Sequence, residues 1–210
     1  MSQSYRSDSR PRAVPQPILK VGKGERTRAR ILDAALEFLW SNPYREMTVG
    51  GVMAATHLSR SAFYRHFHDL HEVMETLLLE VEKEILNAAS PWLTQTGQPI
   101  DLLRESLSGL VRVCHHRGPI LRAIVDSVST DERLDRLWGQ FLGRFDEAVA
   151  SRIKGDRRLG LTAEFEPGTV AMALNRLDVA VLVDAFGRRP RKKQQPVFDV
   201  LFRIWSSTLY

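Results

Sequence analysis

The segment from Thr48 to Phe67, TVGGVMAATHLSRSAFYRHF, contains the side chains with the most distinctive chemistry in this chain. Its pattern predicts two short helices joined by a tight turn. In the second helix, hydroxyl, guanidinium and imidazole groups share one side, and small or aromatic groups share the other. A helix with one packed face and one face rich in hydrogen-bond donors is suited to the major groove of DNA.

Side chains near the start of such a helix reach deepest into the groove, so Arg60 and Ser61 are the candidates for contacts with base edges. An arginine can bond guanine through two parallel hydrogen bonds. Tyr64, His66 and Thr48 suit phosphate oxygens, as do backbone amides at helix N-termini. The full set of predicted DNA-contacting residues is Arg28, Thr48, Ser59, Arg60, Ser61, Tyr64, Arg65 and His66.

Helical patterning also predicts the elements that position this segment. An amphipathic helix precedes it and ends at Asn42-Pro43, because the residue before a proline is pushed out of the helical region. Thr48, Ser59 and Asp69 have side chains that suit the N-caps of the next three helices. The segment therefore has a helix on each side that can hold it.

Two prolines are expected to interrupt helices further along the chain. The helix after Asp69 is predicted to end near Ser90-Pro91, and Gly118-Pro119 is predicted to separate a helix through Leu107 from a short one through Ile124. Three further helices are expected to begin near Asp131, Pro167 and Pro196. No persuasive strand pair or internal repeat is present, so the sequence predicts an all-α fold of about nine helices.

Positive charge is concentrated at the start of the chain. The 210 residues carry a net charge of +5, while the first thirty carry eight basic and two acidic side chains. Residues 1–24 contain few large apolar groups, so they are predicted to form a disordered basic arm. The arm's arginines could contact phosphates or a minor groove, and the alternative is a solvated tail with no role in binding.

The sequence gives little support to catalysis. It contains no phosphate-binding loop, Gly-rich dinucleotide motif or nucleophile motif, so neither an enzyme nor a cofactor is expected. His66, His68 and His71 are close in sequence but lack accompanying acidic ligands at helical spacing, so no metal site is predicted. Cys114 beside His115 is interpreted as a buried structural thiol, because neighbours on a helix point ~100° apart.

The composition of the chain excludes or disfavours several other classes of protein. The single cysteine excludes an internal disulfide and favours a reducing, cytoplasmic location. No apolar run approaches the ~18 residues of a membrane span, and the N-terminus does not resemble a secretory signal. A helical adaptor that binds proteins and not DNA is the remaining rival, disfavoured by the basic arm. The basic stretch RRPRKK at 188–193 is expected to be a solvated loop far from the DNA-binding head.

The stretch LSRSAFYRHF, with its FYxHF core at 63–67, resembles the head of the TetR family of bacterial repressors. The stretches ALNRLD at 173–178, LWGQF at 137–141 and IWSSTLY at 204–210 are similar to the mycobacterial ethionamide-regulator type within that family. Two positions depart from the family pattern. His57 stands in the turn where glycine is usual, although histidine tolerates a positive φ better than most residues. Leu70 stands where a lysine often contacts phosphate.

The resemblance implies a ligand pocket inside the helical body. Asn175, Trp138 and Phe145 match its pocket positions, and Asp178 replaces a second asparagine. An apolar tube with these polar groups suits an elongated apolar ligand carrying a polar or cationic group. The other interpretation is that the aromatic stripe is ordinary core. The predicted ligand-contacting residues are Leu103, Leu107, Leu110, Cys114, Trp138, Phe141, Phe145, Asn175 and Asp178.

The last two predicted helices are apolar nearly all round, which indicates that they are covered on two sides. The family dimerises through a four-helix bundle formed by these helices. A two-fold dimer would present two heads to a palindromic site, with half-sites about 34 Å apart. The predicted interface residues are Val181, Phe186, Phe198, Leu201, Phe202 and Trp205.

These features predict three parts: a basic arm at 1–24, a helix-turn-helix domain at 25–68, and a ligand-binding and dimerisation domain at 69–210. The expected function is a ligand-responsive transcriptional regulator, with repression the favoured mode. Its expected partners are a double-stranded DNA operator, a small apolar or amphipathic effector and a second copy of the chain, with no membrane.

Overall fold

The computed structural model describes residues 22–210, so residues 1–21 of the arm predicted at 1–24 lie outside the described residues. In that range every regular element is helical, which confirms the all-α prediction, with eight α-helices and a 3₁₀ turn where about nine helices were expected. The elements are α1 (Lys23–Ser41), η1 (Tyr44–Glu46), α2 (Val49–Thr56), α3 (Arg60–Tyr64), α4 (Leu70–Thr94), α5 (Pro99–Val125), α6 (Glu132–Arg158), α7 (Pro167–Phe186) and α8 (Gln194–Leu209).

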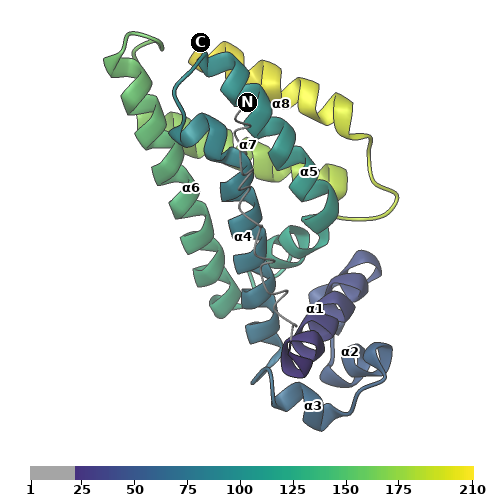
Figure 1. The fold of residues 1–210 in the computed structure, drawn as a ribbon. Helices are drawn as coiled ribbons and strands as arrows, with labels where there is room; N and C mark the ends of the chain where they lie inside the picture. The colour runs from purple at the N-terminus through teal and green to yellow at the C-terminus, as the bar shows by residue number, and fades with distance from the viewer. Residues whose placement is uncertain (1–21) are drawn as a thin grey trace, which may run out of the picture.

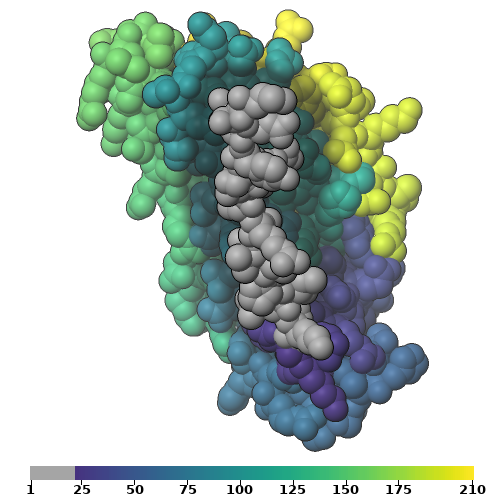
Figure 2. Space-filling model, in the orientation of Figure 1, coloured from purple at the N-terminus to yellow at the C-terminus, as the bar shows by residue number. Residues whose placement is uncertain are grey.

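The helices divide into a small head and a larger body. Figure 1 shows α1, α2 and α3 together at one end, with α4 extending from them along the molecule. The other helices, α5 to α8, surround the far part of α4. The space-filling view in Figure 2 shows the purple and blue head at the lower end of this body. The long helix α4 is therefore a direct covalent connection between the two parts.

Helix α1 is amphipathic and supplies the core of the head. It buries Ile31, Ala35 and Leu39 completely and leaves its charged side outward. The helix begins at Lys23, so the predicted limit of the arm at residue 24 was two residues too late. The amide of Gly22 donates to the Glu25 carboxylate at 3.0 Å, and this bond satisfies one of the free donors at the helix start.

The two helices of the central motif have the caps that the sequence indicated. The Thr48 hydroxyl accepts from the Gly51 amide at 3.0 Å, and the Ser59 hydroxyl accepts from the Ala62 amide at 3.3 Å. Between them His57 adopts a left-handed conformation with φ 54°, as the turn requires. Helix α3 is shorter than expected and ends at Tyr64, since the chain must turn toward α4.

Helix α4 passes through a proline that was expected to end it. Asp69 caps its start as predicted, but the helix continues past Pro91. Proline disturbs the helical hydrogen bonds around it. The Trp92 amide instead donates to the Ser106 hydroxyl at 2.9 Å, and Ser106 donates to the Ala89 carbonyl at 3.1 Å. A side chain from α5 thus bonds the backbone of α4 on both sides of the proline.

The predicted break at Gly118-Pro119 is also absent, because α5 is one continuous helix. Pro119 has no amide hydrogen to offer the carbonyl of His115, four residues earlier. The Arg191 guanidinium donates to that carbonyl at 2.8 Å. Gly118 permits the end of α7 to pass close by, because a Cβ there would lie 2.4 Å from the Phe186 carbonyl oxygen.

The expectation that the basic loop at 188–193 lies far from the head was wrong. Arg189 forms an ion pair with Glu37 of α1 at 2.8 Å. The guanidinium carbons of Arg189 and Arg191 lie 4.8 and 5.2 Å from the centre of the Trp40 ring, also on α1. Packing against an aromatic face is favourable for an arginine and keeps its charge near water.

A second contact between body and head involves a buried arginine. Arg122 of α5 is 6% exposed and donates to the carbonyls of Leu39 at 2.5 Å and Asn42 at 3.1 Å. These carbonyls lie at the C-terminal end of α1, where unpaired acceptors and the helix dipole favour a cation. The orientation of α1 therefore depends on the position of the last turns of α5.

Candidate DNA-binding surface and effector cavity

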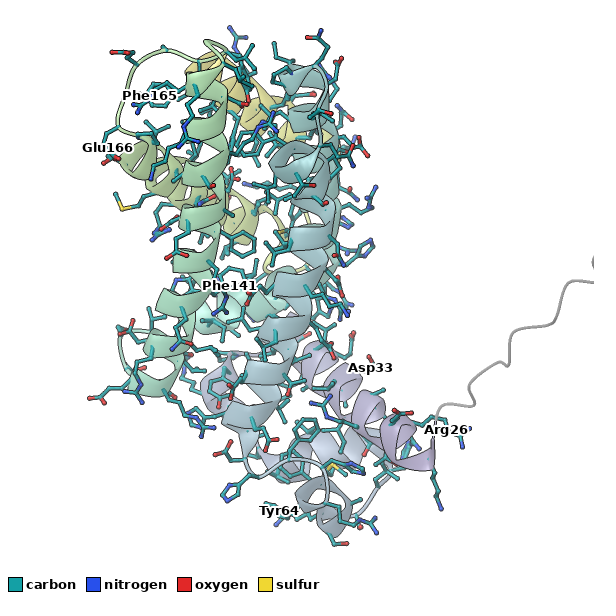
Figure 3. All side chains as sticks on the ribbon, turned by 60° about the vertical axis from the view of Figure 1, so that its left-hand side comes forward. Arg26, Asp33, Tyr64, Phe141, Phe165 and Glu166 are labelled. Carbon is teal, nitrogen blue, oxygen red and sulfur yellow. The ribbon has the colours of Figure 1, made fainter. Side chains whose placement is uncertain are left out.

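The outer face of α3 presents several hydrogen-bond donors to solvent. Arg60, Ser61 and Arg65 are exposed, and Tyr64 is 61% exposed. Figure 3 shows Tyr64 at the end of the head that is farthest from the body. Phe63, on the inner side of the same helix, is completely buried. One short helix thus has the packed face and the donor-rich face that groove binding requires.

The two residues with capping hydroxyls, Thr48 and Ser59, are both exposed. A hydroxyl that accepts a bond from an amide can still donate its own proton. The Ser59 and Ser61 hydroxyl oxygens are 2.8 Å apart, so one of them can donate to the other. Thr48 and the Ser59–Ser61 pair therefore keep donors for phosphate oxygens beside the start of α3.

Gly50 of α2 provides the space in which the Arg60 side chain lies. A Cβ at position 50 would approach Arg60 Nη2 to 2.6 Å, which is closer than non-bonded atoms come. The guanidinium therefore lies directly on the backbone of α2. Gly50 was not among the residues predicted from the sequence, although two consecutive glycines within a predicted helix are a signal that could have indicated it.

Arg28, which was predicted to contact DNA, is half-buried and forms contacts inside the protein. Its guanidinium donates to the Thr76 hydroxyl of α4 at 3.0 Å and lies 4.9 Å from the centre of the Phe67 ring. Arg28 thus joins α1 to α4 inside the head. His66 is half-buried, close to Gly24 of α1, so less of its imidazole is available than expected.

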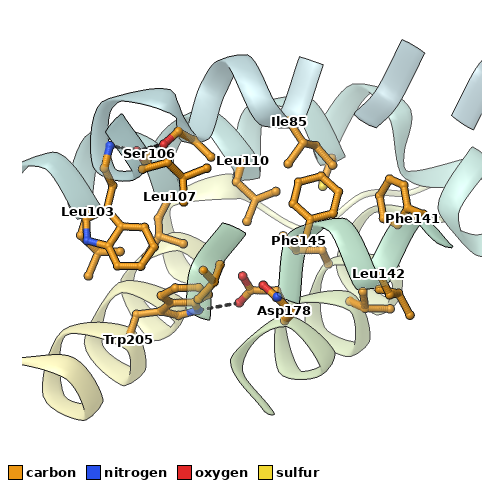
Figure 4. A pocket seen from close by; sticks show the side chains of 18 of the residues that line it. Ile85, Leu103, Ser106, Leu107, Leu110, Phe141, Leu142, Phe145, Asp178 and Trp205 are labelled. Atoms are coloured by element: carbon orange, nitrogen blue, oxygen red, sulfur yellow. Dashed lines mark hydrogen bonds between the residues drawn. The ribbon is translucent and has the colours of Figure 1, made fainter. Parts of the chain in front are cut away.

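An apolar cavity of about 90 Å³ lies within the body. Helices α4, α5, α6, α7 and α8 all contribute to its walls, as the close view in Figure 4 shows. The lining residues are Ile85, Ala89, Trp92, Leu93, Leu103, Ser106, Leu107, Leu110, Cys114, Leu121, Phe141, Leu142, Phe145, Val149, Asn175, Asp178, Val179, Leu182 and Trp205. This set brings together residues that are more than a hundred positions apart in sequence.

Eight of the nine predicted ligand-contacting residues line this cavity, namely Leu103, Leu107, Leu110, Cys114, Phe141, Phe145, Asn175 and Asp178. Trp138 does not line it in this conformation. Its ring stacks on Phe141, which does line the cavity, with ring centroids 5.0 Å apart. The sequence interpretation missed Trp92, because the helix that holds it was expected to end at Pro91.

Asp178 is the main polar group in the cavity wall. It is 6% exposed, and the Trp205 indole nitrogen donates to its Oδ1 at 2.9 Å. Burial raises the pKa of Asp178 to about 7, and the bond from Trp205 opposes this rise only in part. Burial also raises the pKa of the Cys114 thiol, with the nearby Asp178 charge adding to it, so Cys114 is an unreactive thiol.

Asn175 is held by a partner outside the cavity. Its amide nitrogen donates to Asp146 of α6 at 2.8 Å, and Arg176 bonds the same carboxylate at 3.0 and 3.2 Å. The Arg176–Asp146 pair is partly exposed and fixes α7 to α6. Asn175 therefore has a structural bond, although it also lines the cavity.

The predicted dimer-interface residues differ in position. Phe186, Leu201 and Trp205 are at most 3% exposed within one protomer, and Phe198 is 9% exposed. These four were assigned wrongly, because a side chain already covered by its own chain offers no surface to a partner. Val181 and Phe202 are half-buried. Val200, which is 52% exposed, is an apolar side chain of α8 that faces outward.

Among residues 22–210, no group of three or more histidine, cysteine or acidic side chains is placed to hold a metal ion. His71 instead pairs with Asp131 of α6 at 2.7 Å, and Arg133 pairs with Asp69 at 2.7 Å. These two pairs connect the start of α4 to the start of α6. In the same range, no helix combines the length and the apolar character of a membrane span.

Comparison with known families gives the class of this fold and surface. The pattern described as "Bacterial regulatory proteins, tetR family" matches residues 31–76, and "Transcriptional regulator EthR, C-terminal domain" matches residues 103–210. The second match spans more than half of the chain. The chain therefore belongs to the TetR family of bacterial transcriptional regulators, with a body of the EthR type. This confirms the resemblance carried by the FYxHF core, and the family's members are regulators and not enzymes.

Individual relatives agree with this assignment. The chain is 30% identical over 108 residues to the HTH-type transcriptional repressor LfrR of Mycolicibacterium smegmatis, covering 51% of this chain and 54% of that one. It is 28% identical over 138 residues to the nucleoid occlusion factor SlmA of Marinobacter nauticus, covering 64% and 70%.

Solved structures share the fold at low sequence identity. Salmonella enterica GusR has a TM-score of 0.74 at 18% identity and covers 90% of this chain and 98% of its own. A TetR-family regulator from Syntrophomonas wolfei has a TM-score of 0.74 at 14% identity and covers 88% and 95%.

Proposed function

We propose that this protein is a ligand-responsive transcriptional repressor that binds a palindromic operator as a dimer and is released by a small, largely apolar effector. The observation that supports this best is the combination of two sites joined by one helix. An exposed donor-rich α3 lies at one end of α4, and an apolar cavity lies beside its other end. The LfrR relative is itself described as a repressor. Because the proposed partner is bacterial DNA, the protein would act in the cytoplasm.

In the proposed complex α3 enters the major groove. Arg60 and Ser61 contact base edges, and Tyr64 and Arg65 contact phosphates on the rim of the groove. The Thr48 and Ser59 hydroxyls donate to phosphates beside the helix start. Because Arg60 is held against Gly50, its guanidinium is oriented before DNA arrives, which lowers the entropy lost on binding.

The proposed dimer uses the outer faces of α7 and α8. Val200 and Ile204 of α8 and Val181 of α7 are apolar and still have accessible surface in one protomer. The Phe202 ring offers mainly its edge to a partner, because the Arg104 guanidinium lies over the ring, with its carbon 4.0 Å from the ring centre. A two-fold axis through these helices would place the two heads on the same side of the dimer, facing successive turns of DNA.

Release follows from a shift between two conformations. The cavity of about 90 Å³ is far smaller than the ~300 Å³ or more of ordinary ligand pockets. An effector of useful size must therefore move the walls. Ile85 and Ala89 of α4 are two of these walls, and Asp69 at the other end of the same helix borders the head. An effector that binds the moved conformation more tightly shifts the population toward it.

The last turns of α5 offer a second route. Leu121 lines the cavity, while the next residue, Arg122, donates hydrogen bonds to the carbonyls at the end of α1. A displacement of Leu121 is therefore transmitted to α1 through one peptide unit. Through both routes the head would rotate with respect to the dimer axis, and the two α3 helices would no longer match the spacing of the grooves.

The experiment begins with selection of genomic fragments that the purified protein binds, followed by fluorescence polarisation on the shortest bound duplex. Arg60→Ala and Tyr64→Phe should each weaken binding to the selected duplex, and Arg60→Ala should also relax base preference. Arg136→Ala, on an exposed surface of α6, is the matched control for the loss of one arginine. Equal affinity of the Arg60→Ala protein and the control for the selected duplex would refute the proposed interface.

A further inference from the structure

Three acidic side chains are buried in the described part of the chain, and two of them have an arginine. Glu82 is 8% exposed and bonds Arg144 through both oxygens at 2.5 Å. Asp156 is 3% exposed, and Arg152 donates to it at 3.0 Å. Burying a carboxylate is costly unless a cation or several donors compensate it. The usual solution for a buried carboxylate in this protein is therefore a guanidinium.

Asp178 is the third buried acidic residue, and no arginine of residues 22–210 pairs with it. Among the described residues its one hydrogen-bond donor is the neutral Trp205 indole, which reaches a single oxygen. No basic side chain is among the nineteen residues that line the cavity. The second carboxylate oxygen of Asp178 therefore has no donor within the described chain, and the residue lies in the wall of an empty space (Figure 4).

The surroundings of Asp178 are aromatic and aliphatic. Trp205 and Trp92 lie edge to face with ring centroids 5.7 Å apart, and Phe145 and Phe141 lie 4.9 Å apart on the facing helix α6. All four rings line the cavity. Aromatic faces attract ammonium groups through their electron-rich centres, and this attraction increases when water is excluded. A carboxylate within an aromatic wall is thus a suitable environment for an ammonium ion.

We propose that the cavity selects a cationic effector, an amine or quaternary ammonium on an apolar body, with its positive charge beside Asp178. The ligand would supply the cation that arginine supplies to Glu82 and Asp156. This proposal rests on the proposed function and specifies its effector class. A neutral apolar ligand would gain from burial of its surface but would leave the charge of Asp178 uncompensated.

The proposal predicts the direction in which the affinity for the effector changes with pH. Around Asp178, α5 contributes the Cys114 thiol, α8 the Trp205 indole and α7 the Asn175 amide, while α4 and α6 contribute no charged side chain to the cavity. A permanently charged ligand binds the ionised carboxylate, so its affinity must fall as pH drops below the pKa of about 7. The same linkage gives a loss of roughly 30-fold between pH 8.5 and 5.5. A neutral ligand that accepts a bond from the protonated acid would show the opposite trend.

The test compares decyltrimethylammonium with 1-decanol, which has the same alkyl chain without the charge, by calorimetric titration of the full-length protein at pH 5.5, 7 and 8.5. We expect tighter binding of the ammonium probe at high pH. Asp178→Asn, which keeps the size of the side chain, should weaken that probe by on the order of tenfold or more and leave decanol little changed. Glu147→Gln removes one carboxylate from the exposed face of α6 and is the matched control.

Equal affinities for the two probes, an Asp178→Asn protein that binds the ammonium as wild type does, or failure of the ammonium to bind would each overturn the proposal. Operator binding is measured in parallel on the same preparations. A protein that binds DNA but not ammonium refutes the effector class alone. A protein that binds ammonium but no DNA refutes the proposed function and leaves the cation site in place.

Discussion

Replacing Asp178 by asparagine should stabilise the unliganded protein, and the gain should increase with pH. The variant keeps an oxygen to accept from Trp205 and removes only the ionisable group. Burial raises the pKa of Asp178 from 3.8 to about 7, so the folded chain holds this proton more tightly than the unfolded chain does. The stability contributed by the bound proton is complete below pH 3.8 and is lost as pH rises through about 7.

The magnitude follows from the size of the shift. A difference of about three pH units at ~1.4 kcal/mol each corresponds to about 4 kcal/mol for the complete titration. Part of this loss has already occurred at pH 5, because the unfolded carboxyl is ionised there. Between pH 5 and pH 8 the wild type should therefore lose about 2.5 kcal/mol of unfolding free energy relative to Asp178→Asn.

Urea unfolding at pH 5, 6, 7 and 8 measures this difference, at one fixed protein concentration because dimerisation affects apparent stability. Glu147→Gln provides the comparison for an exposed carboxylate and should change the unfolding free energy by less than about 0.5 kcal/mol at every pH. A constant difference between Asp178→Asn and wild type across this range would show that Asp178 titrates normally and would refute our account of its environment.

Three further outcomes are expected from the same geometry. Gly50→Ala should displace the Arg60 guanidinium and weaken operator binding about tenfold, while the thermal midpoint stays within a few degrees of wild type; an unchanged affinity would contradict the contact. Val200→Glu with Ile204→Glu should give a folded monomer in sedimentation analysis, and a persistent dimer would place the interface elsewhere. Arg122→Met should lower the unfolding free energy by about 2 kcal/mol, because two carbonyls at the end of α1 lose their donor, and should reduce the effect of effector on DNA affinity; undiminished effector response would exclude the α5 route.

The local elements of this protein are predictable because they depend on neighbours in sequence. Thr48, Ser59 and Asp69 each bond a backbone amide three residues ahead, so their capping role requires nothing beyond the helix itself. The left-handed turn at His57 and the inward position of Phe63 likewise follow from short-range spacing. The donor-rich face of α3 is therefore largely predictable from the sequence.

Most of the residues predicted from the sequence to line the cavity do line it, but their arrangement in space was less predictable. Leu107, Phe145 and Asp178 were assigned to it from helical spacing and family resemblance, and they line it. The helical periodicity of apolar residues identifies the apolar faces of a helix, but it does not identify the neighbouring helix that each face contacts. Trp138 was predicted to line the cavity and is not among its lining residues, whereas Trp205 was predicted to lie in the dimer interface and lines the cavity.

The sequence by itself determined the helices, their caps and the division between a polar recognition face and an apolar body, since these depend on interactions within a few residues. Tertiary structure decided whether prolines break helices, because Ser106 and Arg191 supply bonds from other elements. It also decided that the loop at 188–193 reaches α1 and that Asp178, unlike Glu82, has no arginine partner among residues 22–210. Such outcomes depend on which side chains distant in sequence become neighbours, and no local pattern contains that information.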